Sequence, residues 1–139
     1  MVAGKATALA VLCLLGGCSE DSTPTGNEGE CAAPTPASST AALPDTLDFE
    51  PLGTVTRVAS DRGLVTVRAV TEGTLEELDR SFSVALEAAG YTIVGSENEV
   101  IEADIYFADP KGRIGGVKFV TTDCGADQVI VRLFIDAKS

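Results

Sequence analysis

Apolar and polar residues alternate along several stretches of the chain after residue 54, the pattern of β-strands that bury one face. β-Branched and aromatic residues, which suit the pleated surface of a sheet, are frequent in these stretches. The pattern predicts strands over residues 55–60, 64–71, 91–95, 100–108, 113–121 and 128–136.

One segment has helical spacing instead. Its apolar residues follow one another at intervals of 3, 4, 3, 1 and 3, which forms a single stripe on a helix: Leu75, Leu78, Phe82, Ala85, Leu86 and Ala89. Thr74 and Glu77 make a capping-box sequence, in which each side chain satisfies a backbone donor of the other residue. Gly90 directly after the stripe is a favoured helix stop.

Short turn sequences connect the predicted strands. Residues 60–63 read Ser-Asp-Arg-Gly, and residues 109–112 read Asp-Pro-Lys-Gly, a favoured type I turn. Consecutive strands joined by such turns are antiparallel. The sequence therefore predicts an α+β fold in which one amphipathic helix packs on a five- to six-stranded, mostly antiparallel sheet, in the order ββαββββ.

Alternation also assigns the two faces of this sheet. Toward the helix it places Val65, Val67, Ala69, Ile101, Ala103, Ile105, Phe107, Val117, Phe119, Val129, Val131, Leu133 and Ile135. Gly115 and Gly116 in the fifth predicted strand indicate a bulge or a close backbone approach.

The other face mixes charged, apolar and aromatic residues. One interpretation is a solvated surface with cross-strand ion pairs, as expected where a single helix covers an antiparallel sheet. The other is a face that binds a partner protein, a second copy of the chain or a ligand. In that case Arg68, Lys118 and Arg132 hold anionic groups, and Tyr106 and Phe134 supply contact area. The candidate binding face then comprises Arg68, Asp104, Tyr106, Lys118, Arg132 and Phe134.

The first residues have the layout of a secretory signal peptide. Lys5 precedes about ten mostly apolar residues, followed by Leu15-Gly16-Gly17-Cys18. This tetrapeptide resembles the lipobox of bacterial lipoproteins, and the resemblance covers about the first twenty residues. It implies removal of residues 1–17 and attachment of diacylglyceryl and acyl groups to Cys18. The alternative is an ordinary secreted protein in which Cys18 is free or disulfide-bonded.

The lipobox resemblance implies a location in the bacterial cell envelope, anchored by lipid on the extracytoplasmic side. Ser19 follows the cysteine where an aspartate would favour inner-membrane retention, which favours the outer membrane in a Gram-negative cell and otherwise the outer face of the plasma membrane. Residues 18–42 are rich in Ser, Thr, Pro and acidic residues, as in a flexible linker. Residues 43–139 are expected to form a single α+β domain.

Composition narrows the function. Removing residues 1–17 removes one lysine and no acid, which takes the formal net charge from −11 to −12. Such a charge repels nucleic acid, so no nucleic-acid partner is expected. The chain has no His, the commonest proton shuttle near neutral pH and the commonest metal ligand. We therefore expect no catalytic residue, no metal and no cofactor.

Two cysteines remain for the predicted oxidising compartment once Cys13 is removed and Cys18 carries lipid. Cys31 and Cys124 are expected to form a disulfide that fixes the start of the domain to a late loop. The alternative is two free or intermolecular thiols.

These expectations combine into a lipid-anchored envelope protein with a small non-enzymatic interaction or ligand-binding domain. Its partners are the membrane, through Cys18, and an envelope protein or a second copy of the chain. One alternative is a structural or stress-related surface lipoprotein without a specific ligand. Another is a hydrolase that uses carboxylates, for which the densest acidic cluster is Glu97, Glu99, Glu102 and Asp104.

Overall fold

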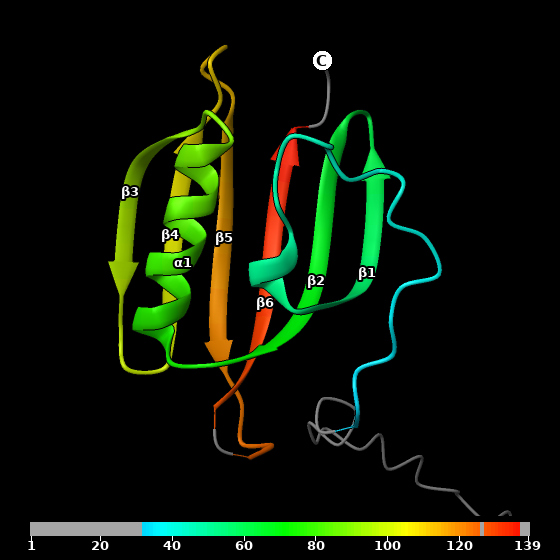
Figure 1. The fold of residues 1–139 in the computed structure, drawn as a ribbon, viewed down its shortest axis with the longest axis vertical. Coiled ribbons are helices and arrows are strands. Elements are labelled where there is room, and N and C mark those ends of the chain that lie inside the picture. The colour runs from blue at the N-terminus through cyan, green and yellow to red at the C-terminus, as the bar shows by residue number, and fades with distance from the viewer. Residues whose placement is uncertain (1–31, 126, 137–139) are drawn as a thin grey trace, which may run out of the picture.

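A six-stranded antiparallel sheet is the frame of the structure, a computed structural model that describes residues 32–125 and 127–136 (Figure 1). The order across the sheet is β1-β2-β6-β5-β4-β3, and all neighbouring strands are antiparallel. The predicted α+β fold and its ββαββββ order are confirmed. The strands are β1 (Thr54–Asp61), β2 (Leu64–Glu72), β3 (Thr92–Asn98), β4 (Glu102–Ala108), β5 (Ile114–Thr121) and β6 (Gln128–Asp136).

The helix α1 (Leu75–Ala88) begins at the predicted capping box. The backbone N–H of Glu77 donates to the Thr74 hydroxyl at 3.3 Å, and the backbone N–H of Thr74 donates to the Glu77 carboxylate at 3.1 Å. Hydrogen bonds from the Thr74 backbone and side chain lower the pKa of Glu77. Gly90 follows the helix with a φ of +87°, which glycine adopts without strain.

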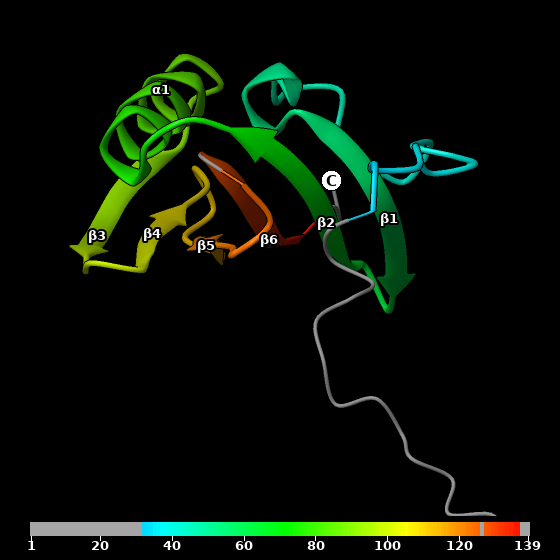
Figure 2. The ribbon, with the colours of Figure 1, turned by 90° about the horizontal axis from the view of Figure 1, so that it is seen from below.

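Two elements cover one face of the sheet, where the sequence predicted a single helix (Figure 2). The helix α1 packs on β3, β4 and β5, and its Phe82 ring meets Phe119 edge to face with centroids 6.0 Å apart. The short 3₁₀ helix η2 (Glu50–Leu52) packs against α1 and β2. Leu47, before η2, and Leu52, at its end, are buried in the core. The second cover is needed because one helix is too narrow for six strands.

One predicted core residue lies outside the core. Ile101 is 61% exposed, because β4 begins at Glu102 and residues 99–101 form the connection from β3. The backbone N–H of Glu99 donates to the Glu102 carbonyl at 2.7 Å, and that of Thr121 donates to the Ile101 carbonyl at 3.0 Å. Val100 and Ile101 in this connection are apolar and β-branched, which is why the sequence predicted a strand that begins at residue 100. The other helix-facing residues expected from alternation are buried: Val65, Val67, Ala69, Ala103, Ile105, Phe107, Val117, Phe119, Val129, Val131, Leu133 and Ile135.

Gly115 and Gly116 mark close approaches and not a bulge, because β5 keeps continuous register with both neighbours. On the core side, a Cβ at Gly115 would overlap the Phe107 ring. On the opposite side, a Cβ at Gly116 would lie 2.6 Å from the Phe134 ring. The two glycines therefore make room for one aromatic ring on each side of the sheet.

Candidate functional site

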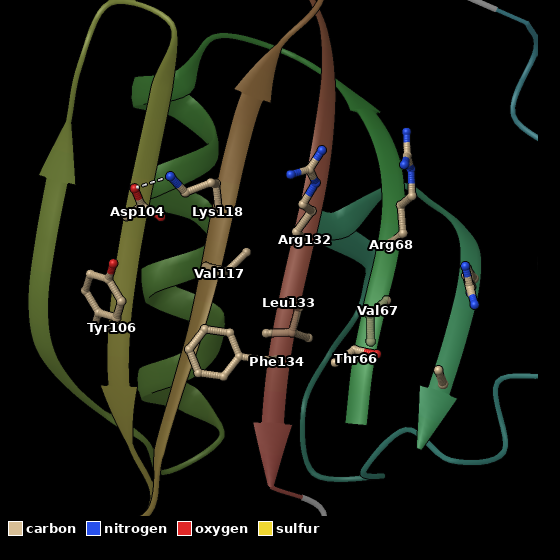
Figure 3. A pocket seen from close by; sticks show the side chains of 12 residues that line it. Thr66, Val67, Arg68, Asp104, Tyr106, Val117, Lys118, Arg132, Leu133 and Phe134 are labelled. Atoms are coloured by element: carbon tan, nitrogen blue, oxygen red, sulfur yellow. Dashed lines mark ion pairs between the residues drawn. The ribbon is translucent and has the colours of Figure 1, made fainter. Parts of the chain in front are cut away.

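The open face, which we define as the side of the sheet opposite α1 and η2, carries a hollow of about 510 Å³ (Figure 3). The six residues of the candidate binding face all line it: Arg68, Asp104, Tyr106, Lys118, Arg132 and Phe134. The structure adds Arg57 and Ala59 from the edge strand β1 and Thr66 from β2. Six residues chosen by alternation, on four separate strands, therefore line one hollow.

The pairing register puts four cations next to one another across four strands, and we call them the cationic row. Each pair of neighbours is directly opposite in the register. With strands about 4.8 Å apart, the row is about 14 Å long. Its members are Arg57 on β1, Arg68 on β2, Arg132 on β6 and Lys118 on β5. Asp104 on β4 and Glu97 on β3 continue the same line with the opposite charge.

Lys118 is paired at its end of the row. Its Nζ lies 3.1 Å from a Glu102 oxygen and 3.2 Å from an Asp104 oxygen. Hydrogen bonds to Glu102 and then to Asp104 raise the pKa of Lys118, although partial desolvation opposes the shift. Asp104 is 8% exposed, so this carboxylate depends on Lys118 for its charge compensation.

Arg132, inside the row, has no carboxylate partner of this kind among the described residues. It lies directly between Arg68 and Lys118, two residues of its own sign. Among the described residues, neither Arg132 nor Arg57 makes an ion pair or a side-chain hydrogen bond. Like charges directly opposite in a sheet are destabilising. The middle of the open face therefore holds positive charge at a cost to the fold, in a chain of net charge −11.

Aromatic residues follow two positions further along the strands. Tyr106 on β4 and Phe134 on β6 lie on either side of Gly116, and both are 39% exposed. We call Tyr106, Gly116 and Phe134 the aromatic row. Two residues of strand separate the aromatic row from the cationic row, which is about 7 Å. Figure 3 shows the two rings on the same side of the sheet as Lys118 and Arg132.

Arg57 was missed by the sequence analysis because of a β-bulge. The register shifts between Val55 and Arg57, so Val55 and Val58, three residues apart, both pack against the core. Strict alternation cannot place residues with odd spacing on one face. The bulge turns Arg57 onto the open face beside Arg68, where it lines the hollow.

A second hollow lies at the edge of the open face. It is lined by residues 32–35 together with Thr56, Arg68, Val70 and Ile130. Ile130 lies between the helix-facing Val129 and Val131 and so belongs to the open face, yet it is only 3% exposed. The backbone N–H of Ala37 donates to the Val55 carbonyl at 2.8 Å. Residues 32–37, predicted as linker, thus contact the edge of the sheet at its cationic end.

The acidic residues near the turn between β4 and β5 are used in structural pairs. Arg113 Nε donates to Asp109 Oδ2 at 2.6 Å, and Arg113 Nη1 lies 3.1 Å from Asp136. Partial desolvation of Asp109 opposes ionisation, but hydrogen bonds from the Arg113 backbone and side chain and from the Lys111 backbone lower its pKa. This cluster ties the turn to the end of β6.

Two predicted site residues, Cys18 and Cys31, lie outside the described residues. Cys124 lies in the connection between β5 and β6, where its backbone N–H donates to the Thr122 hydroxyl at 3.3 Å. The lipid on Cys18 and the pairing of Cys31 with Cys124 stay predictions.

No protein-family model matches the chain, and no curated protein matches it either. Within residues 32–125 and 127–136, no helix has the length and apolar character needed to cross a membrane. The same residues contain no group of three or more Cys, Asp or Glu side chains arranged to hold a metal ion.

Proposed function

We propose that this chain is a bacterial envelope lipoprotein whose domain binds an anionic ligand or partner on the open face and catalyses no reaction. The observation that carries the proposal is the cationic row, with Arg132 uncompensated between two residues of like charge. An anion seated there would remove the repulsion and gain ion-paired hydrogen bonds from guanidinium groups.

A purely structural open face is the competing interpretation, and Lys118 fits it. Its two carboxylate partners are those expected of cross-strand ion pairs on a solvated sheet. That interpretation gives no reason for Arg132 and Arg57, which lack partners in the described part of the chain. It also gives no reason for a hollow that gathers these cations beside two exposed aromatic rings. We therefore favour binding.

The proposed anchor is Cys18, supported by the signal-peptide layout and the lipobox resemblance of residues 15–18. Two or three acyl chains hold a protein firmly at a membrane, whereas one chain binds only marginally. A Cys18→Ser chain is expected to leave the detergent phase that retains the original protein. A variant that still enters the detergent phase would contradict lipidation.

We also propose a disulfide between Cys31 and Cys124, the two cysteines that remain for an oxidising compartment once Cys13 is removed and Cys18 carries lipid. It would hold the start of the domain against the loop between β5 and β6. Mass spectrometry without reduction is expected to find one peptide pair containing both cysteines, lighter than the two free thiols by two hydrogen atoms. Free thiols at both positions would contradict the pairing.

The binding proposal is tested by isothermal titration calorimetry with citrate, on the full chain carrying Cys18→Ser. Arg132→Gln is the test variant. Arg80→Gln is the matched control, because Arg80 lies on α1, on the covered side of the sheet, where it pairs with Glu76. Citrate is expected to bind the parent and the control equally, and the test variant about tenfold more weakly. Equal affinity for all three proteins would contradict the proposal.

A further inference from the structure

The geometry points to a more specific ligand: we propose that the open face binds a flat aromatic anion, a ring system that carries one carboxylate, sulfonate or phosphonate group. This inference rests on the proposed function, since it names the chemistry of the ligand for the same site. It is carried by the arrangement of the cationic row and the aromatic row.

The hollow has an apolar side for a ring. Ala59 and Thr66 continue the line of Phe134 toward the edge of the sheet, and both are small. Because these side chains are small, they leave space beside the partly exposed Phe134 ring in which a flat ring system fits. Ala59, Thr66 and Phe134 all line the hollow, together with the cations two positions away on the same strands.

Gly116 has no side chain, which leaves room for the two aromatic rings to lie over its strand. A Cβ at that position would lie 2.6 Å from the Phe134 ring and 3.4 Å from the Tyr106 ring. Both rings thus share the space over one glycine while staying 39% exposed. Aromatic rings stack in offset or edge-to-face contact with other rings, which favours a flat ligand over an aliphatic one.

The spacing of the two rows sets the size of the ligand. About 7 Å along a strand separates Arg132 from Phe134, so the anionic group lies close to the ring system and not at the end of a long chain. A hollow of about 510 Å³ is at the size of small-molecule sites and accommodates a bicyclic ring.

The charges along the line of the cationic row set the orientation. Positive charge is concentrated on β1, β2 and β6, whereas Asp104 and Glu97 stand on β4 and β3. A second anionic group at the β4 end would be repelled by these acids. A ligand with one anionic end, directed at Arg132, fits this gradient best.

The test compares three probes with the full chain carrying Cys18→Ser: 2-naphthoate, its neutral amide 2-naphthamide, and octanoate as an aliphatic anion. The chain has no Trp, so naphthalene fluorescence anisotropy reports binding without interference from indole. We expect 2-naphthoate to bind at least about tenfold more tightly than either of the other probes.

Two substitutions separate the ring contact from the charge contact. Phe134→Leu keeps an apolar side chain on β6 and is expected to weaken 2-naphthoate about fivefold. Arg132→Gln is expected to weaken it about tenfold. Arg80→Gln and Val84→Ala, on the exposed side of α1, are the matched controls and should change the affinity less than twofold. Unchanged amide NMR spectra away from the open face exclude misfolding.

Each opposite outcome has a distinct meaning. Equal affinity for octanoate and 2-naphthoate, with no effect of Phe134→Leu, would overturn the aromatic inference and leave the anion site standing. Equal affinity for 2-naphthamide and 2-naphthoate, with no effect of Arg132→Gln, would overturn the anion site and therefore the proposed function. Binding of a Glu-rich peptide without binding of 2-naphthoate would also overturn the aromatic inference, in favour of a protein partner.

Discussion

Gly115→Ala and Gly116→Ala are the same chemical change at adjacent positions, yet the structure predicts different costs. A Cβ at Gly115 would overlap the Phe107 ring and lie 2.9 Å from the Phe134 carbonyl oxygen. Phe107 is 1% exposed and packs edge to face on Tyr91 with centroids 5.2 Å apart, so its ring has no room to move. At Gly116 the obstacle is the partly exposed Phe134 ring, which is free to turn toward solvent.

Overpacking a rigid core costs about 1–3 kcal/mol, and the loss of glycine entropy in the unfolded chain returns about 0.4–1 kcal/mol. Gly115→Ala should therefore lower the free energy of unfolding by about 1–2 kcal/mol. Gly116→Ala should lower it by less than about 1 kcal/mol, because the Phe134 ring moves instead of the core. For a domain of about a hundred residues, 1 kcal/mol corresponds to a shift of about 4–8 °C in Tm.

Urea denaturation followed by circular dichroism measures both variants, with Gly95→Ala as the control. A Cβ at Gly95 finds its nearest neighbour, the Tyr106 ring, at 3.7 Å, so that variant should be as stable as the parent or slightly more stable. The reasoning is refuted if Gly115→Ala is as stable as Gly95→Ala, or if Gly116→Ala is the more damaging of the two adjacent changes.

Three further predictions concern the cap, the turn and the cationic row. Thr74→Ala should cost about 1 kcal/mol in urea denaturation, since it removes the hydroxyl that accepts from Glu77, and an unchanged midpoint would contradict the capping box. Asp109→Asn should destabilise the protein at neutral pH. Because the pKa of Asp109 is lowered on folding, the stability difference between parent and variant should vanish as the pH falls through the folded pKa of Asp109, which lies below the ordinary 3.8. A stability difference that persists in acid would refute this prediction. Arg132→Gln should be as stable as the parent or up to about 1 kcal/mol more stable at low salt, since it relieves repulsion from Arg68, and a clear loss of stability would refute a cost to the fold.

The helix and most of the sheet were predictable because local chemistry and tertiary structure agree there. Thr74 and Glu77 close the cap that their sequence predicts, and the residues of β2 and β6 alternate between core and open face. Because β2, β5 and β6 pair without a bulge, the two-residue period of a strand is enough to predict, from the amino-acid sequence alone, that Arg68, Lys118 and Arg132 share one face.

The rest could not be predicted because it depends on contacts between distant residues. The bulge between Val55 and Arg57 has no local sequence signature, and it alone decides that Arg57 joins the row. The covering role of η2 depends on the width of the sheet, which appears only when all six strands are paired. Ile101 is apolar and β-branched, as strand residues often are, but it lies in the connection from β3 to β4 and outside the core.

The arginine side-chain Nε–Hε resonances in nitrogen-15 NMR give the most direct test of the central claim, that the cationic row is an anion site. They are followed while citrate is added at constant ionic strength. Resonances of Arg57 and Arg132 should shift along one saturating curve, while those of Arg62 and Arg80, on the hairpin and on α1, stay in place. A set of shifts that is equal for all arginines, or that never saturates, would contradict a binding site on the open face.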